Sequence, residues 1–293
     1  MPELPEVETI VRGLRTVLPG HTIVSVRLGK TDFIEDPPAL AELLPGRRIE
    51  AVERLGKFIC LHLTAGAAAK LPDRQINLVI HLGMTGGLGV RRPEEPVAPH
   101  THAFFELEDG RELRYTDIRR FGRIRLVPRD RIGDFSERLG QEPLEISAPE
   151  FDRRLAGRRA QIKALLLDQS VFRGIGNIYA DESLWQARIH PARLAARLNS
   201  TELRRLRKSI RRVLQRAIED RGSSISNFVD AEGQPGEYQH RHRAYGREGK
   251  PCFRCGARIQ RVIVAGRSSY FCPRCQAAPR RERAIRKPPR AWA

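Results

Sequence analysis

The chain has 293 residues, with 53 Lys and Arg against 35 Asp and Glu, which gives a formal net charge of +18 at pH 7. This length suits two domains, and the basic excess favours a polyanionic partner, nucleic acid first and an anionic membrane surface second. No run approaches the roughly 20 apolar residues of a membrane span and no secretory signal opens the chain, so we expect a soluble cytoplasmic protein rather than a membrane protein.

The first 20 residues predict a helix, because apolar residues recur at helical spacing until Pro19-Gly20 stops it. From about 21 to 127 the pattern changes to short apolar segments separated by turns. Strands are predicted at Thr22–Leu28, Lys57–Leu63, Ile76–Leu82, Phe104–Leu107 and Ile124–Val127. Strands at this spacing predict a sandwich or barrel-like sheet rather than alternating βα units.

The second half of the sequence is predicted to be helical first and metal-binding after that. Helices are predicted within 151–221, the last of them opened by a capping box of Asn199 and Glu202. A Gly-, Ser- and Asp-rich stretch over 222–238 predicts a mobile loop. The predicted organisation is a β-sandwich domain over 1–128, a linker over 129–150, a helical domain over 151–240, a zinc ribbon over 241–275 and a basic, disordered tail over 276–293. The fold class is therefore α+β.

The opening MPELPEVE places a proline and a glutamate at the extreme terminus. If Met1 is removed, Pro2 offers a secondary amine, and an α-amino group has a pKa of roughly 7.7–8.0 against about 10.4 for lysine. Such an amine attacks an aldehyde-level carbon to give an iminium ion, while Glu3 beside it can protonate the departing oxygen. The alternative is a simple helix start, which both residue types favour.

Four of the five cysteines follow the pattern C-x2-C-x16-C-x2-C, which matches a zinc ribbon. These are Cys252, Cys255, Cys272 and Cys275. Four thiolates leave no open position on the metal, so one structural Zn²⁺ is predicted; two disulfides or a redox pair are the alternatives. The fifth, Cys60, lies in an apolar run and is interpreted as a core residue.

The insert between the cysteine pairs predicts a hairpin that joins 261–264 to 269–271 and presents Arg267 at or beside its tip. In a basic zinc protein, phosphate contact is the favoured function for this arginine, and simple solvation is the alternative.

The segment RGIGNIY over 173–179 lies between two predicted helices, about 160–168 and 178–187. Its glycines let backbone amides approach a phosphate, and Asn177 can cap the following helix. Together with nearby basic residues such as Arg158, this turn favours contact with a DNA backbone; a plain helix–turn–helix corner is the alternative.

Three further positions carry alternatives of their own. Lys57 follows Arg54-Leu55-Gly56 and opens an apolar strand, where a lysine is usually an edge charge. Met84 sits in a glycine-flanked turn, and Phe121 follows two arginines, one of them Arg119. The simplest interpretation is that the Met84 and Phe121 side chains belong to the core. The alternative is that both insert as wedges between stacked bases.

The assembled motifs resemble the formamidopyrimidine-DNA glycosylase family, of the Fpg or MutM type. The resemblance runs from MPELPEVE through RLGK, HLGMTG, RYTDIRRFG, RGIGNIYADES and AYGREGKPC to the closing cysteine pair, and thus covers residues 1–275. Leu4 matches this group, whereas the similar endonuclease VIII group usually has glycine there.

The resemblance implies catalytic roles for four residues. Pro2 would be the nucleophile at the anomeric carbon of the sugar, and Glu3 the proton donor for sugar opening. Lys57 would donate a proton during β-elimination, and Arg267 would act in δ-elimination.

It also implies contacts to DNA. His100, Arg119 and Arg158 match DNA-binding positions, and Asn177 matches a residue that holds phosphates near the lesion. Met84, Arg119 and Phe121 match the trio that fills the gap left by an everted base. The loop 222–238 matches the lid over that base.

The implied function is that of a bifunctional DNA glycosylase and abasic-site lyase of base excision repair. It would excise oxidised purines, such as 8-oxoguanine and ring-opened formamidopyrimidines, from double-stranded DNA and cleave abasic sites, as a nucleoid-associated monomer in the cytoplasm. Two alternatives stay open, a glycosylase that prefers oxidised pyrimidines and a non-catalytic zinc-dependent binder of damaged DNA. Ser223, Ser224, Asn227 and His242 depart from the family pattern in or near the lid, so base preference is the least constrained property.

Overall fold

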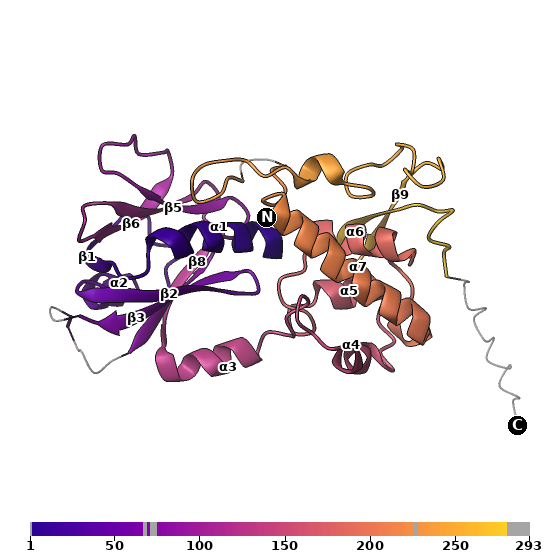
Figure 1. Ribbon diagram of the computed structural model, residues 1–293, viewed down its shortest axis with the longest axis horizontal. Coiled ribbons are helices and arrows are strands. Elements are labelled where there is room, and N and C mark those ends of the chain that lie inside the picture. The colour runs from indigo at the N-terminus through magenta and orange to yellow at the C-terminus, as the bar shows by residue number, and fades with distance from the viewer. Residues whose placement is uncertain (1, 67–68, 71–74, 226–227, 280–293) are drawn as a thin grey trace, which may run out of the picture.

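The computed structural model describes residues 2–66, 69–70, 75–225 and 228–279. Two lobes lie side by side along the long axis of the molecule, a sheet lobe from the first half of the chain and a helical lobe from the second (Figure 1). Disorder was predicted for the basic tail over 276–293. Residues 280–293 lie outside the described residues, whereas Gln276 is buried and its side chain donates to the Ile189 carbonyl at 2.8 Å.

The predicted first helix is present as α1, Leu4–Val17. The sheet contains β1 (Thr22–Leu28), β2 (Arg47–Leu55), β3 (Phe58–Ala65), β4 (Ile76–His81), β5 (Gly86–Arg91), β6 (Thr101–Leu107), β7 (Glu112–Asp117) and β8 (Arg123–Pro128), and α2 (Pro37–Leu43) follows β1. The strand order is β5-β7-β6-β1-β2-β3-β4-β8.

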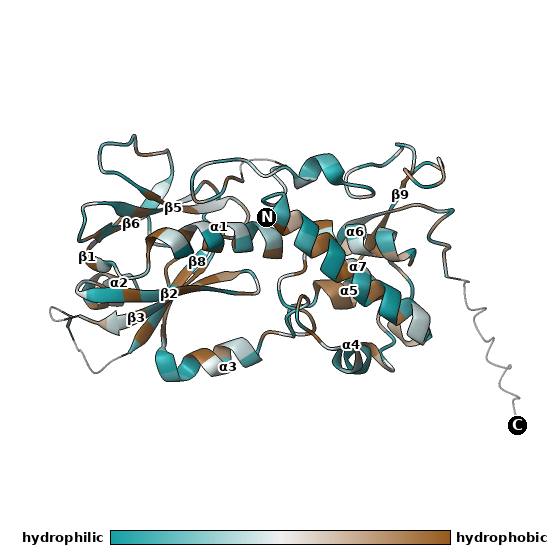
Figure 2. Cartoon of the chain, viewed as in Figure 1, coloured by the Kyte–Doolittle hydropathy of each residue, from teal (hydrophilic) through white to brown (hydrophobic). Residues whose placement is uncertain are grey.

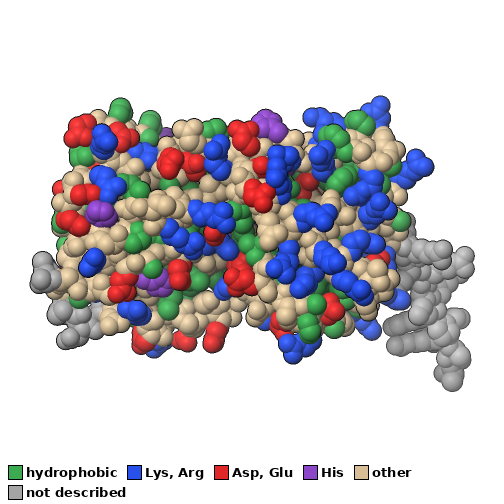
Figure 3. Space-filling view, in the orientation of Figure 1, with side chains coloured by type: hydrophobic (Ala, Val, Ile, Leu, Met, Phe, Trp, Pro, Cys, Tyr) green, Lys and Arg blue, Asp and Glu red, His purple; other side chains and the backbone are tan. Residues whose placement is uncertain are grey.

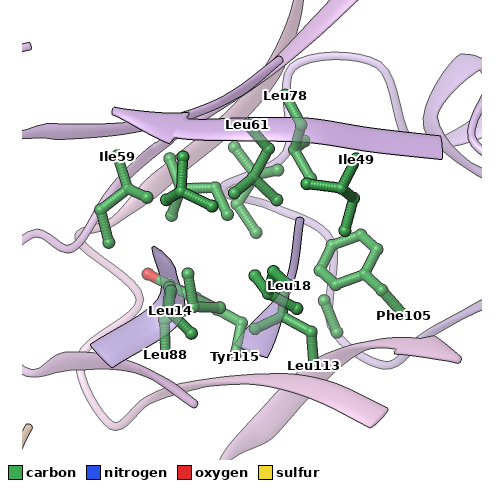
Figure 4. Close-up of a cluster of buried hydrophobic side chains, with 14 of the residues drawn as sticks. Leu14, Leu18, Ile49, Ile59, Leu61, Leu78, Leu88, Phe105, Leu113 and Tyr115 are labelled. Carbon is green, nitrogen blue, oxygen red and sulfur yellow. The ribbon is translucent and has the colours of Figure 1, made fainter. Parts of the chain in front are cut away.

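This sheet folds over on itself to make the predicted sandwich. β1 and β2 pair only at Thr22↔Arg48 and Ile23↔Arg47, so the sheet turns a corner there. Apolar side chains of β2, β3 and β4 face those of β5, β6 and β7 across the core, and Leu14 and Leu18 from the N-terminal helix region lie in the same layer (Figure 4). The core therefore needs both halves of the sheet and α1.

The helical lobe contains α4 (Ala148–Leu155), α5 (Ile162–Leu167), α6 (Asn177–Ala187), η2 (Ala195–Arg197) and α7 (Ser200–Glu219). The capping box of Asn199 and Glu202 is present at the start of α7. Apolar and polar residues alternate along α7 in Figure 2, and its buried face packs on α6, α4 and α1. The segment predicted as the linker contains η1 (Arg129–Arg131) and α3 (Ile132–Glu137).

The last part of the chain that the structure describes contains η3 (Tyr238–Arg241) and the hairpin of β9 (Gln260–Val264) and β10 (Arg267–Phe271). Among the residues that the structure describes, no helix is long and apolar enough to cross a membrane.

α1 joins the two lobes. Its first residue, Leu4, belongs to the core of the helical lobe, whereas Val7 and the later apolar residues of α1 belong to the core of the sandwich. Arg54 of β2 reinforces this joint, since it pairs with Glu8 of α1 at 2.8 Å and with Glu142 at 3.0 Å. The N-terminal end of α1 is therefore held between the lobes.

Candidate active site

The N-terminal segment lies buried at the joint between the lobes. Pro2 is buried and Glu3 is only 2% exposed. The Glu3 carboxylate accepts hydrogen bonds from the backbone amides of Ile178, at 2.9 Å, and Tyr179, at 3.3 Å, in the first turn of α6. Free amides and the helix dipole make this turn a natural site for an anion. Glu3 is thus fixed by residues some 175 positions away in the sequence.

The glycine-containing turn before α6 leaves room for the N-terminal segment. The Leu4 amide donates to the Gly174 carbonyl at 3.0 Å. A Cβ on Gly176 would lie 2.2 Å from the Glu3 carboxyl carbon, far inside van der Waals contact. These glycines make room for Leu4 and Glu3, a contact that the sequence did not indicate.

Replacing Gly176 by Ala should therefore displace the Glu3 carboxylate or open the joint. We expect excision to fall by about 100-fold, the effect of misplacing a reacting group by about 1 Å. Single-turnover excision of a lesion from duplex DNA measures it. Gly133→Ala is the matched control, because a Cβ there meets nothing within 4 Å. Wild-type excision by Gly176→Ala would contradict this assignment.

Burial dominates the electrostatics of Glu3. Loss of water raises the pKa of its carboxyl group above the ordinary value, although the charge of Lys57 and the amides of Ile178 and Tyr179 act in the opposite direction. A carboxyl group with a raised pKa keeps its proton at higher pH, which is what a general acid requires.

A second buried carboxyl group, Glu6, was missed by the sequence reasoning. Burial, with the charge of Glu3 in addition, raises its pKa to about 7. It accepts hydrogen bonds from the Tyr179 hydroxyl, from the Ser223 amide at 2.7 Å and from the Glu3 amide at 2.8 Å. A glutamate three residues after a helix N-cap is a capping-box signal, and this signal could have identified Glu6.

Lys57 reaches the same joint from the sheet lobe. It lies in the two-residue turn between β2 and β3, where Leu55 pairs with Phe58, and it is 8% exposed. Burial lowers the pKa of its amine; the charges of Glu3 and Glu6 raise it, and that of Arg267 lowers it further. These mutual influences place Lys57, Glu3 and Arg267 in one electrostatic environment.

Arg267 begins β10 beside the hairpin turn, as predicted, opposite Val264. The next residue is anchored to the helical lobe, because the Ser268 carbonyl accepts from Lys163 Nζ at 2.9 Å and from Asn177 Nδ2 at 3.1 Å. Lys163 forms a fully buried ion pair with Asp181 at 2.7 Å. The Asn177 side chain thus holds the hairpin strand that carries Arg267, a contact that the sequence did not indicate.

The four paired cysteines come together at the other end of this hairpin. Their Sγ atoms all lie within 4.8 Å of one another, and none of the cysteines is in a disulfide. Thiolates bound to one zinc at about 2.3 Å lie roughly 3.8 Å apart, so the cluster fits a tetrahedral ion. The two thiolate turns are also supported by backbone amides, for example Cys275 N to Cys272 Sγ at 3.4 Å. The cluster is one structural zinc site.

The two apolar residues that were candidates for a wedge are not core residues. Met84 is 39% exposed and Phe121 is 52% exposed. The Arg119 guanidinium lies 4.4 Å from the centroid of the Phe121 ring, in cation–π contact. An exposed methionine and an exposed phenylalanine backed by arginine suit insertion into a base stack.

The remaining predicted residues lie at the surface or in the lid. His100 and Arg158 are exposed, and Lys and Arg side chains crowd the surface of the helical lobe in Figure 3. In the lid, the Ser223 hydroxyl lies 3.1 Å from His242 Nε2, and burial lowers the pKa of that histidine to about 4. Asn227 lies outside the described residues.

Comparison with known proteins gives three family models in chain order. The formamidopyrimidine-DNA glycosylase N-terminal domain matches residues 1–124, and the formamidopyrimidine-DNA glycosylase H2TH domain matches 139–229. The zinc finger found in FPG and IleRS matches 249–278. These models cover the sandwich, the helical lobe and the cysteine cluster in turn.

Whole-chain similarities agree with the models. The formamidopyrimidine-DNA glycosylase of Heliobacterium modesticaldum is 48% identical, over 94% of this chain and 100% of that protein. The Lactococcus lactis Fpg in complex with DNA that contains an abasic site is 33% identical, with a TM-score of 0.85 over 94% of this chain and 100% of that one. The wild-type L. lactis protein in complex with DNA that contains an oxidised pyrimidine is also 33% identical, with a TM-score of 0.84 at the same coverage of both chains.

Proposed function

The chain belongs to the formamidopyrimidine-DNA glycosylase family, and from this premise we propose that it is a bifunctional DNA glycosylase and abasic-site lyase of base excision repair. Its substrates are oxidised purines, namely 8-oxoguanine and ring-opened formamidopyrimidines, in double-stranded DNA. The observation that carries the proposal is the buried N-terminal Pro2-Glu3 pair, with Glu3 held on the first turn of α6. A protein that only binds DNA has no use for an acid in that position.

The N-terminal pair performs the first step. Once Met1 is removed, the Pro2 nitrogen attacks C1′ of the damaged nucleotide, and the bond from C1′ to the base breaks. The base leaves with the electron pair of that bond and takes up the proton that the Pro2 nitrogen releases. Glu3, whose pKa is raised by burial, donates its proton to the sugar ring oxygen as the ring opens. The result is an iminium ion between Pro2 and the open sugar.

The later steps break the two phosphate ester bonds. The iminium ion acidifies the C2′ proton, so its loss expels the 3′ phosphate, and a second elimination expels the 5′ phosphate. Lys57, whose pKa is lowered by burial, moves a proton in the first elimination, and Arg267 acts in the second. A one-nucleotide gap with phosphorylated ends remains.

The rest of the predicted site holds the DNA. A paired base shields its sugar, so the nucleotide is everted at an unstacking cost of a few kcal/mol. Met84, Arg119 and Phe121 fill the space that it leaves, while His100, Arg119, Arg158 and Asn177 contact the backbone. The lid over 222–238 covers the everted base. We place the sandwich of 1–128 on one side of the duplex and the helical and zinc units on the other, in a monomer associated with the nucleoid in the cytoplasm.

Borohydride trapping tests the proposal. The chain is incubated with a duplex that contains 8-oxoguanine opposite cytosine, reduced, and digested for peptide mass spectrometry. We expect a covalent adduct on Pro2, which also shows that Met1 has been removed. Tight DNA binding without any adduct would refute the mechanism and favour the non-catalytic binder.

Oxidised pyrimidines are the second candidate substrate class. A similar structure, that of the L. lactis protein, holds DNA with an oxidised pyrimidine, and Ser223 and Ser224 of this lid depart from the family pattern. Excision rates on matched 8-oxoguanine and thymine glycol duplexes decide between the classes.

A further inference from the structure

The exposed side chains Met84 and Phe121 come from two different loops that touch each other. Met84 lies in the connection from β4 to β5, and Phe121 lies in that from β7 to β8. Gly83 adopts φ +62°, and a Cβ there would lie 2.4 Å from the Phe121 carbonyl carbon. The backbones of the two loops are therefore in direct contact, and only glycine permits it.

One buried carboxylate connects these loops. Asp117, at the end of β7, is completely buried. Its Oδ1 atom accepts from the Thr85 hydroxyl at 2.6 Å and from the Arg119 amide at 3.2 Å. Its Oδ2 atom accepts from the Gly122 amide at 2.8 Å and from the Tyr115 hydroxyl at 3.2 Å. Asp117 thus binds Thr85, which follows Met84, and also Arg119 and Gly122, which lie on either side of Phe121.

The same residue also reaches a predicted DNA-contact position. The Asp117 backbone amide donates to the His100 carbonyl at 3.0 Å, and His100 has a positive φ of 64°. A left-handed conformation is uncommon for a residue with a side chain and persists where neighbouring contacts hold it. Asp117 therefore contacts three loops that each present a predicted DNA contact.

We propose that Asp117 is the positioning residue that makes the Met84 loop and the Arg119–Phe121 loop one rigid wedge. The inference rests on the proposed function and adds to it a residue that touches neither the reacting atoms nor DNA. A wedge enters a base stack only if its tip stays rigid, because ordering two loops at the moment of insertion would offset the gain from filling the gap. Asp117 provides that order before DNA binds.

An amide cannot replace this carboxylate. All four partners of Asp117 donate, and a carboxylate offers two accepting oxygens. Asn keeps one accepting oxygen and turns its own NH₂ group toward two of the donors, so Asp117→Asn leaves at least one backbone amide without an acceptor. The Asn side chain has nearly the same size as Asp, so packing is retained, but the two loops no longer share a carboxylate that accepts from both.

The experiment compares substrates that need the wedge with one that does not. We expect Asp117→Asn to lower single-turnover excision of a paired lesion from duplex DNA by about 10- to 100-fold. Cleavage of an abasic site in a single-stranded oligonucleotide should stay within about twofold, because no stack is opened there. The fluorescence of a 2-aminopurine placed next to the lesion measures the rate of unstacking. In the variant this rate should fall by the same factor as excision.

Asp109→Asn is the matched control, since the Asp109 carboxylate also accepts from the backbone amide two residues on, that of Arg111 at 3.1 Å, at an exposed turn of the same lobe. It should leave every rate unchanged. Thr85→Val removes the hydroxyl that donates to Asp117 and accepts from the Arg119 amide, but it leaves the Asp117 carboxylate in place. It should give a smaller loss in the same direction, which keeps the test valid if Asp117→Asn folds poorly.

Unchanged duplex excision in Asp117→Asn, or an equal loss on the single-stranded substrate, overturns the inference. Absence of cleavage by the wild-type chain on every oligonucleotide refutes the proposed function, and the inference with it, and is distinct from a loss confined to the variant.

Discussion

Replacing Glu3 by Gln should lower the rate of 8-oxoguanine excision by about 10²- to 10⁴-fold, the contribution that a positioned general acid usually makes. The Gln carboxamide keeps the size of the side chain and one acceptor for the amides of Ile178 and Tyr179, but it has no acidic proton to donate. DNA affinity should change little, because Glu3 is buried within the protein. Single-turnover excision and equilibrium binding to the same duplex separate the two effects.

The pH dependence sharpens this prediction. Because burial raises the pKa of Glu3, its protonated form persists toward neutral pH, and wild-type excision should fall as the pH rises through that raised pKa. Glu3→Gln should lose this limb of the pH–rate profile. Glu50→Gln is the matched control, since Glu50 is exposed on β2 and pairs with Arg129. An unchanged excision rate in Glu3→Gln would exclude Glu3 as the acid.

Removing zinc should abolish specific DNA binding while the sandwich stays folded. Structural zinc sites contribute about 10–16 kcal/mol of apparent binding free energy, which becomes folding free energy of the finger. Without the ion, β9 and β10 lose the constraint at one end, and the contacts of the Ser268 carbonyl with Lys163 and Asn177, which fix the strand that carries Arg267, are weakened. The sandwich core contains no residue of the hairpin, so it should survive.

Four measurements check the zinc prediction. Metal content and DNA binding should fall together after chelation or in Cys272→Ser, and hydrogen exchange of β3 and β4 should stay slow. Trp185 packs against Cys252 and Cys272, so its fluorescence should report opening of the finger. Cys60→Ala removes the thiol outside the cluster and should retain both zinc and binding. Intact binding by the metal-free protein would contradict the assignment.

Much of the fold could be predicted because its signals are local. The helix near the N-terminus, five strands, the capping box at Asn199 and the cysteine spacing each depend on residues close in sequence. β5 and β7 gave no such signal. β5 reads GGLGVR, with glycines in place of strand formers, and β7 carries Glu112, Arg114 and Asp117. Partner strands, rather than their own composition, hold these two in the sheet.

The site was less predictable because its contacts are distant. Nothing local indicates that Glu3 meets α6, or that Asp181 pairs with Lys163 beneath the hairpin. Glu182 is a further case, since its buried carboxylate accepts the amides of Arg243, Ala244 and Tyr245 and so anchors the segment that enters the finger. Asp181 and Glu182 read in the sequence as ordinary surface charges of a helix, and for Glu3 the sequence indicates a function but not the helix that holds it.

The burial of Pro2 at the joint of the two lobes has a consequence for the order of synthesis. Pro2 and Glu3 leave the ribosome first, but Ile178 and Tyr179, which close over Glu3, follow some 175 residues later. At about 5–20 residues per second, this interval lasts roughly 10–35 s. During that interval nothing of the helical lobe holds the N-terminal segment, so Met1 can be removed before Glu3 is fixed on α6. The catalytic amine can therefore be released while the chain is still being made.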